Sequence, residues 1–90
     1  MISASMVAAN VWEVVVEKPV ETVHRVGLSP EYHRKLCGGG MTQEWVIVQA
    51  FRFLLEREAN TSILPEFDLE EIGRYFPEFE TEMARRLGRP

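Results

Sequence analysis

The chain has 90 residues, of which 46% are apolar and 27% charged, with a net charge of −4 and one cysteine. This length fits one domain over residues 1–90, and the ordinary apolar fraction excludes a chain that is mostly disordered. A single cysteine permits no intrachain disulfide, which excludes a secreted disulfide scaffold.

The charge is unevenly distributed along the chain. Up to Leu55 five acids balance five bases, whereas nine acids and two bases lie between Glu56 and Glu82. Binding to nucleic acid depends on Lys and Arg contacts to phosphates, so this acidic second half argues against a nucleic-acid partner. The N-terminus lacks the positive region of a signal peptide, and no apolar run is long enough to span a bilayer. The expected location is the cytoplasm, with no membrane contact.

The N-terminal third predicts a two-stranded antiparallel β-hairpin over residues 10–28. Residues 1–9 carry no periodic pattern and are expected to be disordered. Apolar side chains alternate with acids over residues 11–17, and a second alternating run covers residues 20–28. Lys18-Pro19 separates the two runs, because proline has no N–H to donate to a neighbouring strand.

Residues 29–87 predict three to four helices, which makes the expected fold α+β. Ser29-Pro30 is typical of a helix start, and Gly38-Gly39-Gly40 is typical of a helix end. Two short helices are expected in the tail, one after Asp68 and one after Pro77. The apolar side chains of this tail recur at spacings that predict one inward face. They are Leu64, Phe67, Leu69, Ile72, Tyr75, Phe76, Phe79 and Met83.

The main helix, expected over residues 43–59 with Thr42 as its cap, is apolar around more than half of its circumference. A surface helix needs an apolar stripe of only about 100°. A domain of this size has a thin core, so the excess apolar surface predicts a second copy of the chain in a symmetric homodimer. The residues expected at the dimer interface are Val46, Ile47, Phe51, Phe53 and Leu54.

Three side chains are candidate metal ligands. His33 and Cys37 lie four residues apart on one face of the first predicted helix, and His24 lies on the strand before it. Imidazole and thiolate groups suit zinc or copper. However, no CxxC or HExxH motif is present and a fourth ligand is missing. The simpler interpretation is a solvated helix face and a packed cysteine, so no metal or other cofactor is expected.

No motif predicts catalysis. Gly38-Gly39-Gly40 lacks the lysine of a phosphate-binding loop, so a linker is the favoured interpretation. The acids Glu66, Asp68, Glu70 and Glu71 have a local explanation at a helix start, where carboxylates cap the helix and complement its dipole. We therefore expect that the protein is not an enzyme.

The favoured function is a protein-interaction or structural module that self-associates. Two alternatives stay open. One is a metal- or thiol-dependent protein that uses His24, His33 and Cys37. The other is a regulatory adaptor or antitoxin-like subunit that binds another protein through the acidic patch after Glu56.

The segment Ser62–Met83, SILPEFDLEEIGRYFPEFETEM, resembles the tail of a family of small uncharacterised bacterial proteins with the pattern SIL-xx-FDL-xx-I-x-RYFPE. The preceding FRFLLERE, Phe51–Glu58, is similar to a helix end in that family, whereas the hairpin is similar in pattern only. Over residues 13–87 the resemblance implies a bacterial origin and the same arrangement of hairpin and helices. It implies no activity and no catalytic residues.

Overall fold

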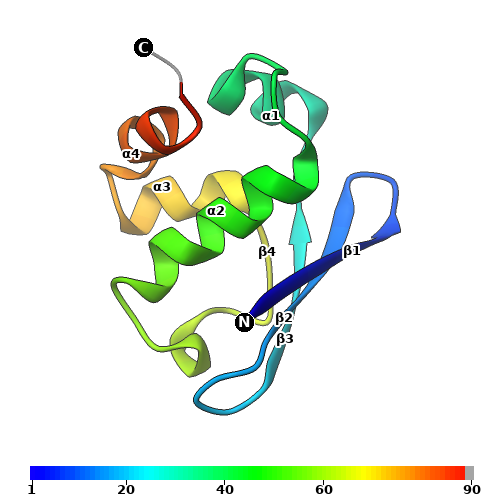
Figure 1. Cartoon of the computed structure of the whole chain (residues 1–90), viewed down its shortest axis with the longest axis vertical. Coiled ribbons are helices and arrows are strands. Elements are labelled where there is room, and N and C mark those ends of the chain that lie inside the picture. The colour runs from blue at the N-terminus through cyan, green and yellow to red at the C-terminus, as the bar shows by residue number, and fades with distance from the viewer. Residues whose placement is uncertain (89–90) are drawn as a thin grey trace.

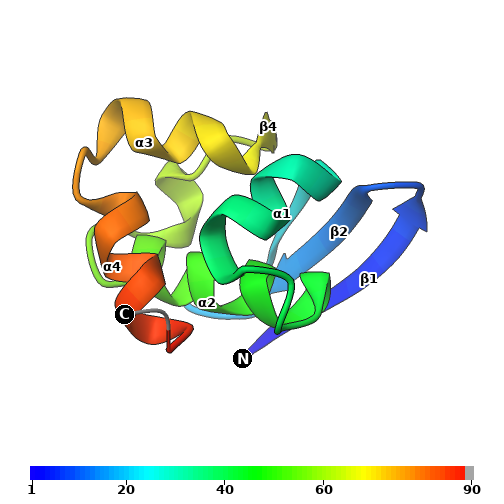
Figure 2. The ribbon, with the colours of Figure 1, turned by 90° about the horizontal axis from the view of Figure 1, so that it is seen from above.

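The computed structural model describes residues 1–88 and shows an α+β fold, with helices packed on one face of a four-stranded sheet (Figures 1 and 2). Residues 89 and 90 of the predicted domain lie outside the described part. Strands β1 (Ile2–Ala8), β2 (Val11–Val16) and β3 (Thr22–Gly27) are antiparallel neighbours, and β4 (Glu66–Asp68) pairs with β3 in parallel. The order β1-β2-β3-β4 makes β1 and β4 the two edges of the sheet.

The predicted hairpin corresponds to β2 and β3, but the prediction of two strands was incomplete. The N-terminal residues expected to be disordered form β1 instead. Ile2, Ala4 and Met6 lie opposite β2 residues that face the core, so β1 extends the apolar inner face of the sheet. Ser3 and Ser5 lie on the other face of β1. Because these residues are small and uncharged, the sequence shows no clear alternation of apolar and charged side chains there, and the strand was not predicted.

The second additional strand, β4, comes from the tail. Its three residues are too few for an alternating pattern, and its parallel pairing with β3 joins segments far apart in the sequence. Arg25 N donates to Pro65 O at 2.8 Å at the start of this pairing. Gly27 leaves room for the Asp68 side chain of β4, because a Cβ atom at position 27 would lie 2.3 Å from Asp68 Oδ1.

The helices are α1 (Pro30–Cys37), α2 (Gln43–Leu55), α3 (Ile72–Tyr75) and α4 (Phe79–Arg86). Two 3₁₀ turns, η1 (Asn60–Ser62) and η2 (Leu69–Glu71), lead into β4 and α3 respectively. All of the helices in residues 1–88 are too short or too polar to cross a bilayer. These four helices agree with the three to four that the sequence predicted. Helix α2 ends at Leu55, four residues before the expected position 59.

The predicted helix boundaries rest on local hydrogen bonds that the structure contains. Ser29 Oγ accepts from Tyr32 N at 3.1 Å, and Thr42 Oγ1 accepts from Trp45 N at 3.1 Å. Both hydroxyls satisfy an N–H group that has no partner within the helix. Gly38, with a φ of 67°, ends α1 in the left-handed conformation that glycine adopts without strain.

Helix α2 lies at the centre of the core, and its apolar surface is covered within a single chain. The sheet covers one side, while α1 and the tail cover others (Figure 2). The interface predicted at Val46, Ile47, Phe51, Phe53 and Leu54 is therefore corrected, since all five side chains are buried in the protomer. The tail supplies the cover that was expected from a second copy, with Phe67, Leu69, Ile72, Phe79, Met83 and Leu87.

Polar contacts also hold α4 in place. Tyr32 Oη on α1 donates to Glu80 Oε2 at 2.9 Å, and burial together with this bond raises the pKa of the Tyr32 hydroxyl well above its ordinary value. Arg86 Nη2 donates to Glu56 Oε1 at 2.5 Å, which lowers the pKa of the Glu56 carboxyl. These contacts attach the tail to both earlier helices.

Candidate protein-binding groove

The structure does not bring the three candidate metal ligands together. His24 is buried on β3, where Nδ1 lies 2.8 Å from Leu64 O and Nε2 lies 2.9 Å from Thr22 Oγ1. Because a carbonyl only accepts, Nδ1 carries the proton and Nε2 accepts from the threonine hydroxyl. Among residues 1–88 no group of three or more His, Cys, Asp or Glu side chains is placed to hold a metal ion.

His33 and Cys37 instead close the glycine linker between α1 and α2. His33 Nε2 donates to Met41 O at 2.6 Å, and Cys37 Sγ lies 3.8 Å from the same oxygen. Cys37 Sγ also donates to His33 O at 3.3 Å, within its own helix. Their spacing of four residues therefore has a structural explanation. It places both side chains at the Met41 carbonyl, where they hold the backbone that follows the three glycines.

We expect that a chelator leaves the thermal midpoint of the protein unchanged. The binding energy of a structural metal would be part of the folding energy, so its removal would destabilise the fold strongly. The measurement is thermal denaturation of the purified chain with and without EDTA. A fall of many degrees in EDTA, abolished in a His24→Ala variant, would contradict this expectation.

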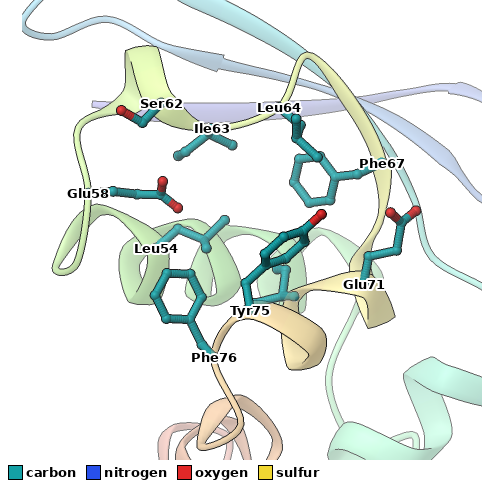
Figure 3. A pocket seen from close by; sticks show the side chains of 10 residues that line it. Leu54, Glu58, Ser62, Ile63, Leu64, Phe67, Glu71, Tyr75 and Phe76 are labelled. Atoms are coloured by element: carbon teal, nitrogen blue, oxygen red, sulfur yellow. The ribbon is translucent and has the colours of Figure 1, made fainter.

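The clearest candidate site is an apolar groove of about 220 Å³ between the C-terminal end of α2 and the tail (Figure 3). Its walls come from α2, from the segment around η1 and β4, and from η2 and α3. The sequence did not predict this groove. Its lining consists of Leu54, Glu58, Ser62, Ile63, Leu64, Phe67, Glu71, Ile72, Tyr75 and Phe76.

The groove has a buried apolar floor and an exposed apolar rim. Leu54, Ile63 and Phe67 belong to the core and form part of the floor. At the rim Leu64 is 47% exposed and Tyr75 is 66% exposed. The prediction that both side chains turn inward with the rest of the tail was therefore wrong. Large apolar side chains gathered around a hollow are typical of a surface that a partner covers.

A buried polar network fixes the position of this rim. Asn60 Nδ2 donates to Val20 O at 2.6 Å and to Thr22 Oγ1 at 2.8 Å. The same threonine hydroxyl contacts His24, whose other nitrogen holds the carbonyl of Leu64. The network therefore connects the turn between β2 and β3 to the backbone at the groove rim.

The groove is negatively charged. Glu58 and Glu71 are part of its lining, to which residues 1–88 contribute no lysine or arginine. Glu71 Oε2 accepts from Asp68 N at 2.9 Å, whereas the Glu58 carboxylate has no hydrogen bond or ion pair with any described residue. An adjoining hollow shares Phe67 and Glu71 with the groove and adds Glu66, Asp68 and one base, Arg25, from the part of the chain that the structure describes.

Other acids of the second half are paired with arginines of α4. Glu56 binds Arg86, and Glu82 binds Arg85 and Arg86. These hydrogen bonds lower the pKa values of both carboxyls. The acidic patch predicted after Glu56 is thus divided, and much of its unpaired charge lies at the groove.

The groove is smaller than the roughly 300–1,000 Å³ of a typical small-molecule site. A volume of about 220 Å³ suits a single anchoring side chain of a partner. Comparisons with protein-family models, with curated proteins and with solved structures find no match to this chain. What the groove binds is therefore inferred from its own shape, exposure and charge.

Proposed function

We propose that this chain is a non-enzymatic protein-binding module whose groove receives one large apolar side chain of a partner, next to a lysine or arginine. The observation that supports this most directly is the exposure of Leu64 and Tyr75 beside a buried apolar floor. Most of the binding energy of an interface comes from a few anchors in such desolvated pockets, and tyrosine is enriched among them.

The charge of the groove selects the neighbour of that anchor. The Glu58 carboxylate has no partner among the described residues, and Glu71 also lines the groove. A basic residue beside the anchor would meet these carboxylates at the rim. Partly exposed charges at the rim of an interface add more to the association rate and to specificity than to affinity. The partner is therefore a segment in which Lys or Arg flanks Leu, Met, Phe or Trp.

The experiment is selection of peptides from a random display library on the immobilised full chain. We expect the selected peptides to share a large apolar residue adjacent to Lys or Arg. We also expect Tyr75→Ala to weaken a selected peptide by about tenfold or more, which corresponds to about 1.4 kcal/mol. The mutant should keep the thermal midpoint of the wild type, because the Tyr75 side chain lies mostly in solvent.

The chain offers matched controls for both features of the groove. For the rim, Leu64→Ser is compared with Val23→Ser, because Val23 is 49% exposed but lies on the open face of the sheet. For the charge, Glu58→Gln should reduce affinity and its salt dependence, whereas Glu31→Gln on α1 should change neither. Peptides of unrelated composition, or equal binding by Tyr75→Ala and wild type, would overturn the proposal.

A further inference from the structure

The two edges of the sheet differ in how they are protected against pairing. The β4 edge has three residues, two of them acidic, and follows Pro65. Short length, charge and proline are the features by which natural edge strands avoid pairing. The β1 edge has seven residues, Ile2–Ala8, and contains no charged residue and no proline. β1 is therefore the open edge of this sheet.

The backbone groups of β1 that face outward can be identified from its pairing with β2. Glu17 N donates to Met1 O at 3.2 Å, so this pair is of the hydrogen-bonded type. Such pairs alternate along an antiparallel ladder, which places the N–H and C=O groups of Ile2, Ala4 and Met6 on the side away from β2. Among the described residues, β1 forms backbone hydrogen bonds only with β2. The Glu17–Met1 bond continues this pairing just beyond the ends of the two strands.

We propose that β1 pairs in antiparallel orientation with β1 of a second copy, around a two-fold axis at Ala4. The register follows from the end of the regular strand, because a bulge interrupts β1 between Met6 and Ala8. The regular part, Ile2–Met6, is centred on Ala4. In this register Ile2 of one copy lies opposite Met6 of the other, and the three outward-facing residues of each copy are all paired.

The side chains across this junction are compatible. Opposite residues in an antiparallel pair point to the same face of the sheet. Ser3 of one copy would meet Ser5 of the other on the open face, so no like charges oppose each other. On the inner face, Met6 is 60% exposed in one chain and would gain an apolar neighbour in Ile2 of the second copy. The junction is self-complementary, as a two-fold interface requires.

This interface is independent of the groove. The groove adjoins β4, at the opposite edge of the sheet from β1 (Figure 1). A dimer joined through β1 would therefore leave two grooves open, and a partner with two anchors would bind with increased avidity. Failure of the groove proposal would leave dimerisation unaffected, and the reverse also holds.

The test is sedimentation equilibrium of the full chain at tens of micromolar. We expect a dimer of twice the 10.4 kDa chain mass. We also expect the amides of Ile2, Ala4 and Met6 to exchange more slowly at high than at low protein concentration. A monomer under these conditions, or an open series of larger species, would overturn the proposal.

Matched variants test the register. Ser3→Lys with Ser5→Lys places lysines opposite each other across the junction and should give a monomer. Ser3→Glu with Ser5→Lys places opposite charges there and should keep the dimer. In both variants the residue at position 5 lies opposite Glu13 of β2, so they differ only at position 3. A dimer that persists in both variants would place the interface elsewhere on the molecule. A dimer lost in both would contradict the proposed register, in which positions 3 and 5 lie opposite each other.

A backbone variant tests the same edge without added charge. Ala4→Pro removes an N–H that faces away from β2, so β1 should stay paired with β2 while losing the contact with the second copy. Circular dichroism checks that the variant is folded. A folded Ala4→Pro protein that remains a dimer would contradict pairing through β1.

Discussion

Replacing Phe79 with alanine is expected to unfold the protein or to lower its thermal midpoint by more than about 10 °C. The Phe79 side chain is 0% exposed, and its ring packs edge-on against Phe53 with centroids 5.1 Å apart. Truncation of a buried phenylalanine typically costs about 3–5 kcal/mol, because the cavity that remains cannot fully collapse. That is a large share of the roughly 5–15 kcal/mol that stabilises an ordinary domain.

The control is a second truncation on the same helix. Thr81 lies on α4 and is exposed, so Thr81→Ala should leave the midpoint nearly unchanged. Glu80 is a poorer control, because its carboxylate accepts the hydrogen bond from Tyr32 and pairs with Lys35. If Phe79→Ala and Thr81→Ala have the same thermal midpoint, the tail is not part of the core.

Phe76→Ala should give a smaller effect than Phe79→Ala. The Phe76 ring also packs edge-on against Phe53, with centroids 5.9 Å apart, but its side chain is only partly buried and lines the groove. The sequence alone predicts equal effects, since both residues belong to the same apolar pattern. The structure separates a core position from a position shared between core and groove.

Local signals in this sequence predicted local structure well. Caps such as Ser29 and Thr42 depend on hydrogen bonds to residues three positions away, so the sequence contains the whole interaction. The inward face of α4 follows the same logic, because Phe79 and Met83 are one helical turn apart and both are buried.

Non-local contacts account for what the sequence could not predict. The apolar circumference of α2 indicated that the helix must be covered, but not whether the tail or a second copy covers it. Likewise, Leu64 and Tyr75 follow the same spacing as their buried neighbours, and only the path of the tail leaves them exposed at the groove. His24 was a reasonable ligand candidate until the structure placed it beside Thr22 and Leu64.

Asn60→Ala is expected to destabilise the protein by about 1–3 kcal/mol. The Asn60 side chain is fully buried, and its amide nitrogen donates to both Val20 O and Thr22 Oγ1. Removal of the amide leaves these two oxygens with one donor fewer at a partly buried site. Asn60 Oδ1 has no partner within residues 1–88, so its loss offsets part of the cost. The measurement is denaturant unfolding, with exposed Thr61→Ala as the control.

A double-mutant cycle with Thr22→Val tests whether the network acts as one unit. The Thr22 hydroxyl lies between Asn60 and His24, at 2.8 Å and 2.9 Å, so each contact helps to orient the other. Residues that share a hydrogen-bond network typically show interaction energies of about 0.5–3 kcal/mol. We therefore expect the double variant to lose less stability than the sum of the two single variants. Additive losses would mean that the three side chains contribute separately, and that the groove rim at Leu64 is not fixed through Asn60.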